Sequence, residues 1–192
     1  MAKFSATHPL DEFFSTVGKG SAKGVTVECI DGRGIIQVFA SNGKTKAVQR
    51  ALGIKETPGQ SSSTKDYLAI PLCPGEWMLV SSKANPKDFA KGIAAKLKKN
   101  GYVSEQSDAR VIFRISGPKA RELMQKGCRL DLHPSATKAG WCAQTQMAQV
   151  GTIIHQNDDK PTYDICVYSG FAQHFAEWLL HSGAQLGLQF KK

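Results

Sequence analysis

The sequence has no long apolar run. No segment approaches the roughly 20 apolar residues that a helix needs to cross a bilayer, and the start of the chain lacks the apolar core of a secretory signal. We therefore expect a cytoplasmic protein without membrane contact. Its 192 residues, 41% of them hydrophobic, are enough to bury a core as one domain or as two small domains packed together.

Metal-binding spacing is also missing. The chain has five cysteines, an odd number, and none of them forms a CxxC pair. Most lie in or beside segments that read as strands, so we expect buried, reduced thiols and no metal site.

The common catalytic motifs are absent as well: there is no GxSxG, HExxH or P-loop, and no GxGxxG after a strand. Residues 31–34 (DGRG) lack the third glycine and the following helix of a dinucleotide site. Asp131 and His133 lie two residues apart and could orient a base, but no nucleophile is identifiable near them. We expect Asp131 to brace its loop and His133 to meet backbone or a partner. The prediction is a chain with no catalytic, cofactor-binding or metal-binding residue.

Acidic residues are scarce relative to basic ones. The net charge is +9, and residues 1–101 hold 15 Lys/Arg against 8 Asp/Glu, a net of +7. This excess indicates either an acidic partner or a solvated lysine face on a helix near residues 87–99. Nucleic-acid binding is weakly supported, because the lysines are not interleaved with aromatic residues on which bases stack.

Periodicity predicts the elements of the first half. Strands at 25–30 and 35–40 are expected to form a hairpin through the Asp-Gly turn, and a helix at 44–52 follows, capped by Ser41-Asn42 and ended by Gly53. Two more strands are expected at 67–72 and 76–81. A helix then opens at Asn85-Pro86, with buried positions 89, 93 and 97.

The second half reads similarly. A strand at 111–116 precedes a helix at 118–126, which Ser116 would cap and Gly127 would end in the left-handed conformation. Strands are expected at 142–150, 152–156 and 163–168, with Gly151 as a bend. The closing helix spans about 169–186, with an apolar stripe of Phe171, Phe175, Trp178 and Leu179.

The order strand, helix, strands, helix thus occurs twice. This predicts an α+β fold of two similar split βαβ units, ferredoxin-like sandwiches, that form one compact body. The expected organisation is an N-terminal arm at 1–24, a first unit at 25–101 and a second unit at 102–192.

Several motifs occur in an informative order. They are a PGEWML strand at 74–79, SGPKARELM at 116–124, a DLHP turn at 131–134 and SGFAQHFAEWL at 169–179. Together, over about residues 17–187, they resemble the gamma subunit of heterotetrameric sarcosine oxidase. The DLHP turn after SGPxAR is the most specific part. The closing helix departs from the family at Gly170 and His174, which leaves open the N-methyl amine that the parent complex oxidises.

The resemblance implies a fold like that of the glycine-cleavage T-protein, which binds folate. It implies a non-catalytic subunit with alpha, beta and delta partners, beta being the expected contact. FAD, FMN, NAD, zinc and tetrahydrofolate would then lie on the other subunits of a complex that demethylates sarcosine to glycine and releases hydrogen peroxide. Turns and arms that do not close a core are free to dock, so the expected interface residues are Phe13, Phe14, Arg121, Asp131, His133 and Pro134. Two alternatives remain open: a stand-alone folate-binding domain of the T-protein type, and a basic protein associated with nucleic acid.

Overall fold

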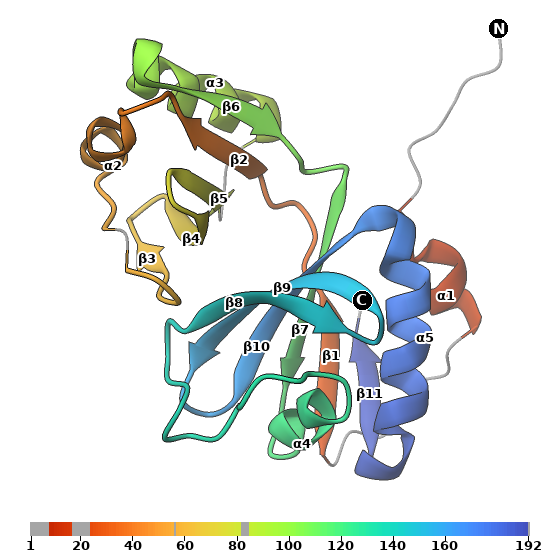
Figure 1. Ribbon diagram of the computed structural model, residues 1–192. Coiled ribbons are helices and arrows are strands. Elements are labelled where there is room, and N and C mark those ends of the chain that lie inside the picture. The colour runs from red at the N-terminus through yellow and green to blue at the C-terminus, as the bar shows by residue number, and fades with distance from the viewer. Residues whose placement is uncertain (1–7, 17–23, 56, 82–84, 192) are drawn as a thin grey trace, which may run out of the picture.

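The chain folds into two sheets, each with helices on one face (Figure 1). One sheet is antiparallel, and the other is mixed because it contains one parallel pair among its described strands. The computed structural model describes all residues except 1–7, 17–23, 56, 82–84 and 192. Part of the expected N-terminal arm lies outside these residues. None of the helices in the described part of the chain is long and apolar enough to cross a membrane.

The smaller sheet has five strands in the order β3-β4-β5-β2-β6, and all of its pairs are antiparallel. Its elements are β2 (Ile35–Ala40), α2 (Thr45–Leu52), β3 (Ser62–Ser63), β4 (Tyr67–Cys73), β5 (Glu76–Ser81), α3 (Pro86–Leu97), a 3-10 turn (Lys98–Asn100) and β6 (Gly101–Glu105).

The larger sheet has six strands in the order β11-β1-β7-β10-β9-β8, and only β11 and β1 are parallel among its described pairs. Its elements are α1 (Asp11–Thr16), β1 (Val25–Cys29), β7 (Arg110–Ser116), α4 (Ala120–Gln125), β8 (Cys142–Met147), β9 (Val150–Asp158), β10 (Thr162–Tyr168), α5 (Ala172–Gly183) and β11 (Leu188–Lys191). Two 3-10 turns, Ser169–Phe171 and Ala184–Leu186, flank α5.

Both sheets follow one connectivity, which confirms the predicted fold class. The chain passes through β2, α2, β4, β5, α3 and β6, and then through β7, α4, β9, β10, α5 and β11. Each series is the β-α-β-β-α-β order of a ferredoxin-like unit. In the second series β1 is inserted between β7 and β11.

The predicted hairpin between residues 25–30 and 35–40 is wrong. β1 pairs with β7, with Val27 opposite Ile115, whereas β2 pairs with β5 and β6 in the other sheet. The residues between β1 and β2 therefore cross from one sheet to the other. The apolar face of each strand explains the difference: Val27 belongs to the core under the larger sheet and Val38 to the core under the smaller one.

Among the described residues, three apolar clusters form the core. One packs α1, α4 and α5 on the larger sheet, and a second packs α2 and α3 on the smaller sheet. The third lies between the sheets and joins residues of both, among them Ile35, Met78, Ile112 and Ile153. Alternation along each strand supplies side chains to both faces, so neither sheet turns a wholly polar face outward.

One predicted helix cap is confirmed and two are wrong. Ser41-Asn42 does not cap α2, because Lys44 is its first flanking residue and no side chain in the described part of the chain caps the helix. Asn85 caps α3 as predicted, since its Oδ1 accepts from the backbone N–H groups of Lys87 and Asp88. The lysines of this helix at positions 87, 91 and 96 are exposed, as a solvated face requires. Ser116 does not cap α4, because it is the last residue of β7 and lies opposite Thr26.

Gly127 does not end α4 through a left-handed backbone, because its φ is not positive. A Cβ at this position would lie 2.5 Å from the Trp178 ring. The glycine is therefore needed for the close approach of α5 and the end of α4.

The strand after Cys142 turns earlier than predicted. Ala148 and Gln149 have φ of 53° and 65° and make the hairpin turn, whereas Gly151 lies inside β9. Phe171, predicted within the core stripe of α5, is 53% exposed in the preceding 3-10 turn. Four of the five cysteines are buried as expected, and Cys73 is exposed.

Candidate functional site

A cavity of about 300 Å³ with a mixed polar and apolar lining lies between the two sheets. Residues of β4 and β5 line it from one side, and residues of β7, β9 and β10 line it from the other. Its polar lining includes Arg33, Lys65, Arg114, His155, Asn157 and Asp164. Three cationic side chains face one carboxylate, so the cavity favours anionic groups.

Arg114 and Asp164 form a two-point ion pair on the floor of this cavity. They lie directly opposite each other on β7 and β10. Nε and Nη2 of the guanidinium donate to the two carboxylate oxygens at 2.7 and 2.8 Å. The bond to Asp164 raises the pKa of Arg114 above its ordinary value. Asp164 is thus occupied by Arg114, so it is a weak candidate for a general base.

His155 on β9 is 6% exposed and faces the same cavity. Its Nε2 lies 3.0 Å from the Ser61 hydroxyl. Burial lowers its pKa, and the nearby Asp164 offsets this only in part. Among the described residues, no group meets its buried Nδ1 with good hydrogen-bond geometry. A serine nucleophile needs a base that a third group orients, and this pair lacks one.

The Ser61–His155 contact belongs to a series of bonds that join the two halves. The Ser61 N–H donates to the Gly140 carbonyl at 2.8 Å, and the Cys142 N–H donates to the Gly59 carbonyl at 2.9 Å. The segment before β4 is therefore fixed against the start of β8. These polar groups stabilise the relative position of the two sheets.

The aromatic residues predicted at an interface occupy different environments. Phe13 in α1 is buried, with its ring centroid 5.0 Å from that of Phe190 in β11. Phe14 is half-buried beside it. The α1 helix thus covers the edge of the core under the larger sheet, and Phe14 is the more accessible of the two rings.

Arg121, which the sequence also predicted at the interface, lies on α4. It is half-buried, and its Nε donates to the Tyr163 hydroxyl at 3.2 Å. The bond attaches α4 to β10 and leaves part of the guanidinium accessible.

The loop of Asp131, His133 and Pro134 is exposed but internally braced. Asp131 Oδ1 accepts from the His133 backbone N–H at 2.8 Å, and His133 Nδ1 lies 2.7 Å from the Ser135 hydroxyl. Leu132 points inward and is 1% exposed. The bracing interpretation of Asp131 is confirmed. Whether this loop, Arg121 and the two phenylalanines meet a partner stays a prediction.

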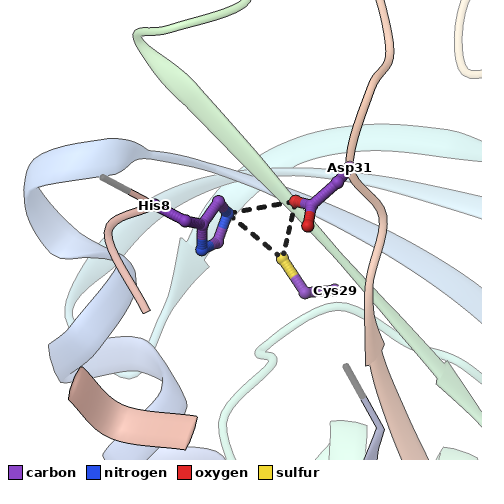
Figure 2. A group of neighbouring side chains, drawn as sticks. All are labelled: His8, Cys29 and Asp31. Carbon is purple, nitrogen blue, oxygen red and sulfur yellow. Dashed lines mark hydrogen bonds and ion pairs between the residues drawn. The ribbon is translucent and has the colours of Figure 1, made fainter. Parts of the chain in front are cut away.

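A second group of side chains was missed at the level of sequence. His8, Cys29 and Asp31 converge where the segment before α1 meets the end of β1 (Figure 2). Their spacing of 21 and 2 residues matches no familiar motif, so only the fold brings them together.

Comparison with known proteins decides the family. Residues 57–190 match the family model described as the GCVT N-terminal domain. The chain belongs to the GCVT N-terminal domain family. The match covers more than two thirds of the sequence and includes the cavity-lining strands β4, β5, β7, β9 and β10.

The similarity to sarcosine oxidase gamma subunits is confirmed. Such a subunit from Corynebacterium sp. (strain P-1) is 29% identical over 120 residues, which is 62% of this chain and 58% of the relative. One from Corynebacterium sp. (strain U-96) is 24% identical over 134 residues, or 70% of this chain and 65% of the relative. The aligned part of this GCVT-domain chain thus spans less than two thirds of either relative.

Solved structures share the fold. A chain of heterotetrameric sarcosine oxidase from Corynebacterium sp. U-96 superposes with a TM-score of 0.83 at 19% identity, covering 95% of this chain and 96% of that one. The glycine cleavage system aminomethyltransferase T from Bartonella henselae gives a TM-score of 0.67 at 15% identity, covering 88% of this chain and 48% of that one. The GCVT-domain chain therefore has the T-protein-like fold that its motifs predicted.

Proposed function

We propose that this chain is the non-catalytic gamma subunit of a heterotetrameric oxidase that demethylates sarcosine to glycine and releases hydrogen peroxide. The observation that carries the proposal is its similarity to two sarcosine oxidase gamma subunits, together with a fold match over almost the full length of both chains. The Ser61–His155 contact of the inter-sheet cavity supports it, because this contact joins the two halves, whereas Arg114 and Asp164 bond to each other within the larger sheet.

In this proposal the partners are alpha, beta and delta subunits, with beta in contact. FAD, FMN, NAD, zinc and tetrahydrofolate belong to those subunits. The complex functions in the cytoplasm.

The proposed docking surface is the braced loop of Asp131, His133 and Pro134, extended by Arg121 and the Phe13–Phe14 pair. A loop that is already held in one conformation loses little conformational freedom on binding. The buried Leu132 anchors the loop, while the three other side chains are exposed. Phe13 is buried and would contribute indirectly, because its ring packs against that of Phe14 and holds it in position.

We also propose that the chain comprises an arm at 1–24 and units at 25–101 and 102–192. The repeated connectivity supports two units. The sheets depart from these bounds at two places: β1 (Val25–Cys29) lies in the sheet of the second unit, and β6 (Gly101–Glu105) lies in the sheet of the first.

Co-expression with alpha, beta and delta subunits of a heterotetrameric sarcosine oxidase, followed by size exclusion, tests the subunit assignment. We expect the chain to self-associate when it is made alone, because an obligate subunit exposes an apolar interface, and to co-elute with the beta subunit when both are present. A monomeric chain that never co-elutes with beta would overturn the assignment.

His133→Ala tests the docking surface separately. We expect affinity for the partner to fall about 5- to 10-fold, which is typical of an interface residue that carries binding energy. Lys91→Ala, which changes an exposed residue on α3, is the matched control and should bind like wild type. Equal affinity of the two variants would exclude the loop while leaving the assignment intact.

A second candidate function is folate binding by this chain itself, which the cationic lining of the cavity favours. The cavity is at the lower limit of the volumes that enclose drug-sized ligands, about 300 Å³, so it would hold only one carboxylate-bearing end. Titration of the full chain with tetrahydrofolate, with Arg33→Ala as the variant, separates the candidates. Saturable binding that the variant weakens favours this second function, whereas the leading proposal expects none.

A further inference from the structure

His8, Cys29 and Asp31 bring three different metal-binding atoms to one place (Figure 2). His8 lies just before α1, Cys29 is the last residue of β1, and Asp31 lies in the crossover to β2. Cys29 is 6% exposed, and the His8 and Asp31 side chains are 25% and 56% exposed. The group is therefore closed on the thiol side and open on the carboxylate side.

The distances within the group match the edges of a coordination tetrahedron. His8 Nε2 is 3.1 Å from Asp31 Oδ1 and 3.6 Å from Cys29 Sγ, and Sγ is 3.5 Å from Oδ1. With zinc-to-sulfur bonds of about 2.3 Å and zinc-to-nitrogen or zinc-to-oxygen bonds of about 2.0 Å, the corresponding edges are about 3.3, 3.5 and 3.5 Å. A cation at the centre would need almost no movement of these atoms.

We propose that His8, Cys29 and Asp31 form a three-ligand site for a divalent transition metal ion of the zinc class. Imidazole, thiolate and carboxylate are the donors that Zn²⁺ takes in proteins. His8 and Asp31 also line an open pocket of about 410 Å³, which leaves room for water as the fourth ligand. Arg33 and Arg110 line this pocket too, opposed by Asp108, so charges of both signs surround the site.

Protons must move for the metal to bind. Without metal, the Leu10 N–H donates to His8 Nδ1 at 3.1 Å, so Nε2 carries the imidazole proton and donates to Asp31. The Cys29 thiol donates to Asp31 Oδ1 at 3.5 Å, so it carries its proton in this arrangement. The metal would displace the thiol proton to solvent and shift the imidazole proton from Nε2 to Nδ1. One proton is released per ion, and binding tightens as pH rises.

The same hydrogen bond predicts a modest affinity. Metal-binding histidines usually donate from the second nitrogen to an acceptor, which strengthens the ligand. Here that nitrogen faces the Leu10 N–H, and this bond would be lost on binding. The ion would compensate by tying the segment before α1 to the β1–β2 crossover, next to the buried Leu10 and Phe13.

Metal titration of the full chain, purified alone or with its partner subunits and stripped with a chelator, tests the proposal. Zn²⁺ is titrated in competition with a chromophoric chelator, and Co²⁺ is used as a spectroscopic probe. We expect one ion per chain, a thiolate-to-Co²⁺ charge-transfer band, and the visible absorption of a tetrahedral site. Cys29→Ser and Asp31→Asn should each weaken binding at least about 10-fold.

Cys128→Ser is the matched control, since Cys128 is also a buried thiol of the same apolar cluster. It should keep the cobalt spectrum and the affinity of wild type. The difference between Cys29→Ser and wild type also isolates this site from metals on other subunits. No stoichiometric binding by wild type, or a cobalt thiolate band unchanged in Cys29→Ser, would overturn the proposal. Asp31→Asn alters an exposed side chain, so it remains informative if Cys29→Ser is poorly folded.

Discussion

Replacing Asp164 with asparagine should destabilise the protein by about 2 kcal/mol. The change removes one of the two bonds to Arg114 and the charge that neutralises the guanidinium. Exposed pairs contribute about 0–1 kcal/mol, whereas breaking a buried pair costs about 3–5 kcal/mol. The side chains of Arg114 and Asp164 are 31% and 17% exposed, so an intermediate value applies. Glu28, opposite Arg114 on β1, retains part of the neutralisation.

Urea unfolding and thermal melting measure this effect. For a chain of this size, about 2 kcal/mol corresponds to a decrease in Tm of about 4–8 °C. Asp66→Asn makes the same chemical change at an exposed position and should alter stability by less than about 0.5 kcal/mol. If Asp164→Asn were equally mild, the reasoning that Arg114 depends on this carboxylate would be refuted.

A double variant tests whether the penalty comes from the unpaired charge. Arg114→Met with Asp164→Leu removes both charges and keeps apolar volume between the sheets. We expect it to recover most of the lost stability, because a buried pair can often be replaced by packed apolar groups at little net cost. A double variant less stable than Asp164→Asn would show that the ion pair itself stabilises the pairing of β7 and β10.

Three other outcomes are expected. Gly127→Ala should destabilise the protein by about 1–3 kcal/mol in denaturant unfolding, because its Cβ would meet the Trp178 ring. Gly92→Ala is the control: Gly92 lies inside α3 with open space around it, so this change should stabilise the protein by up to about 1 kcal/mol. Burial lowers the pKa of His155, so its contribution to stability is complete above pH 6.5, the unfolded value, and is lost as pH falls below 6.5. His155→Gln should therefore make the free energy of unfolding depend less on pH below 6.5. A pH profile like that of wild type would contradict this. A thiol reagent should react rapidly with the exposed Cys73 and slowly with the four buried cysteines; two or more rapid thiols would contradict the packing.

The sequence predicted the repeated α+β architecture because alternation and helical periodicity are strong in the long elements. The positions of Phe89, Ile93 and Leu97 on α3 are buried as their spacing required. The Asn85 cap and the Gly53 helix end were also predictable, since each depends on a local backbone requirement. Local chemistry determines these features, so they can be inferred without the rest of the fold.

The missed elements depend on distant partners. β6 and β11 complete the two units, but they have only five and four residues. Their hydrophobic alternation is too short to predict a strand, and only the fold shows that they pair with β2 and β1. The Asp-Gly signal after β1 wrongly suggested a hairpin, because the turn instead leads into a crossover between sheets. The group of His8, Cys29 and Asp31 could not be predicted for the same reason, since His8 reaches it only when α1 has packed on the core.

The insertion of β1 has a consequence for biosynthesis. As the ribosome releases the chain from its N-terminus, Val25–Cys29 emerges first, yet both of its neighbours, β7 and β11, are encoded in the second half. The smaller sheet contains only β2 to β6 and can close while the rest is still being made. In the larger sheet, β1 is synthesised before β7 and β11, so it stays unpaired until both have been made. A product truncated before β11 would leave one edge of β1 without backbone hydrogen bonds and prone to pair with another molecule.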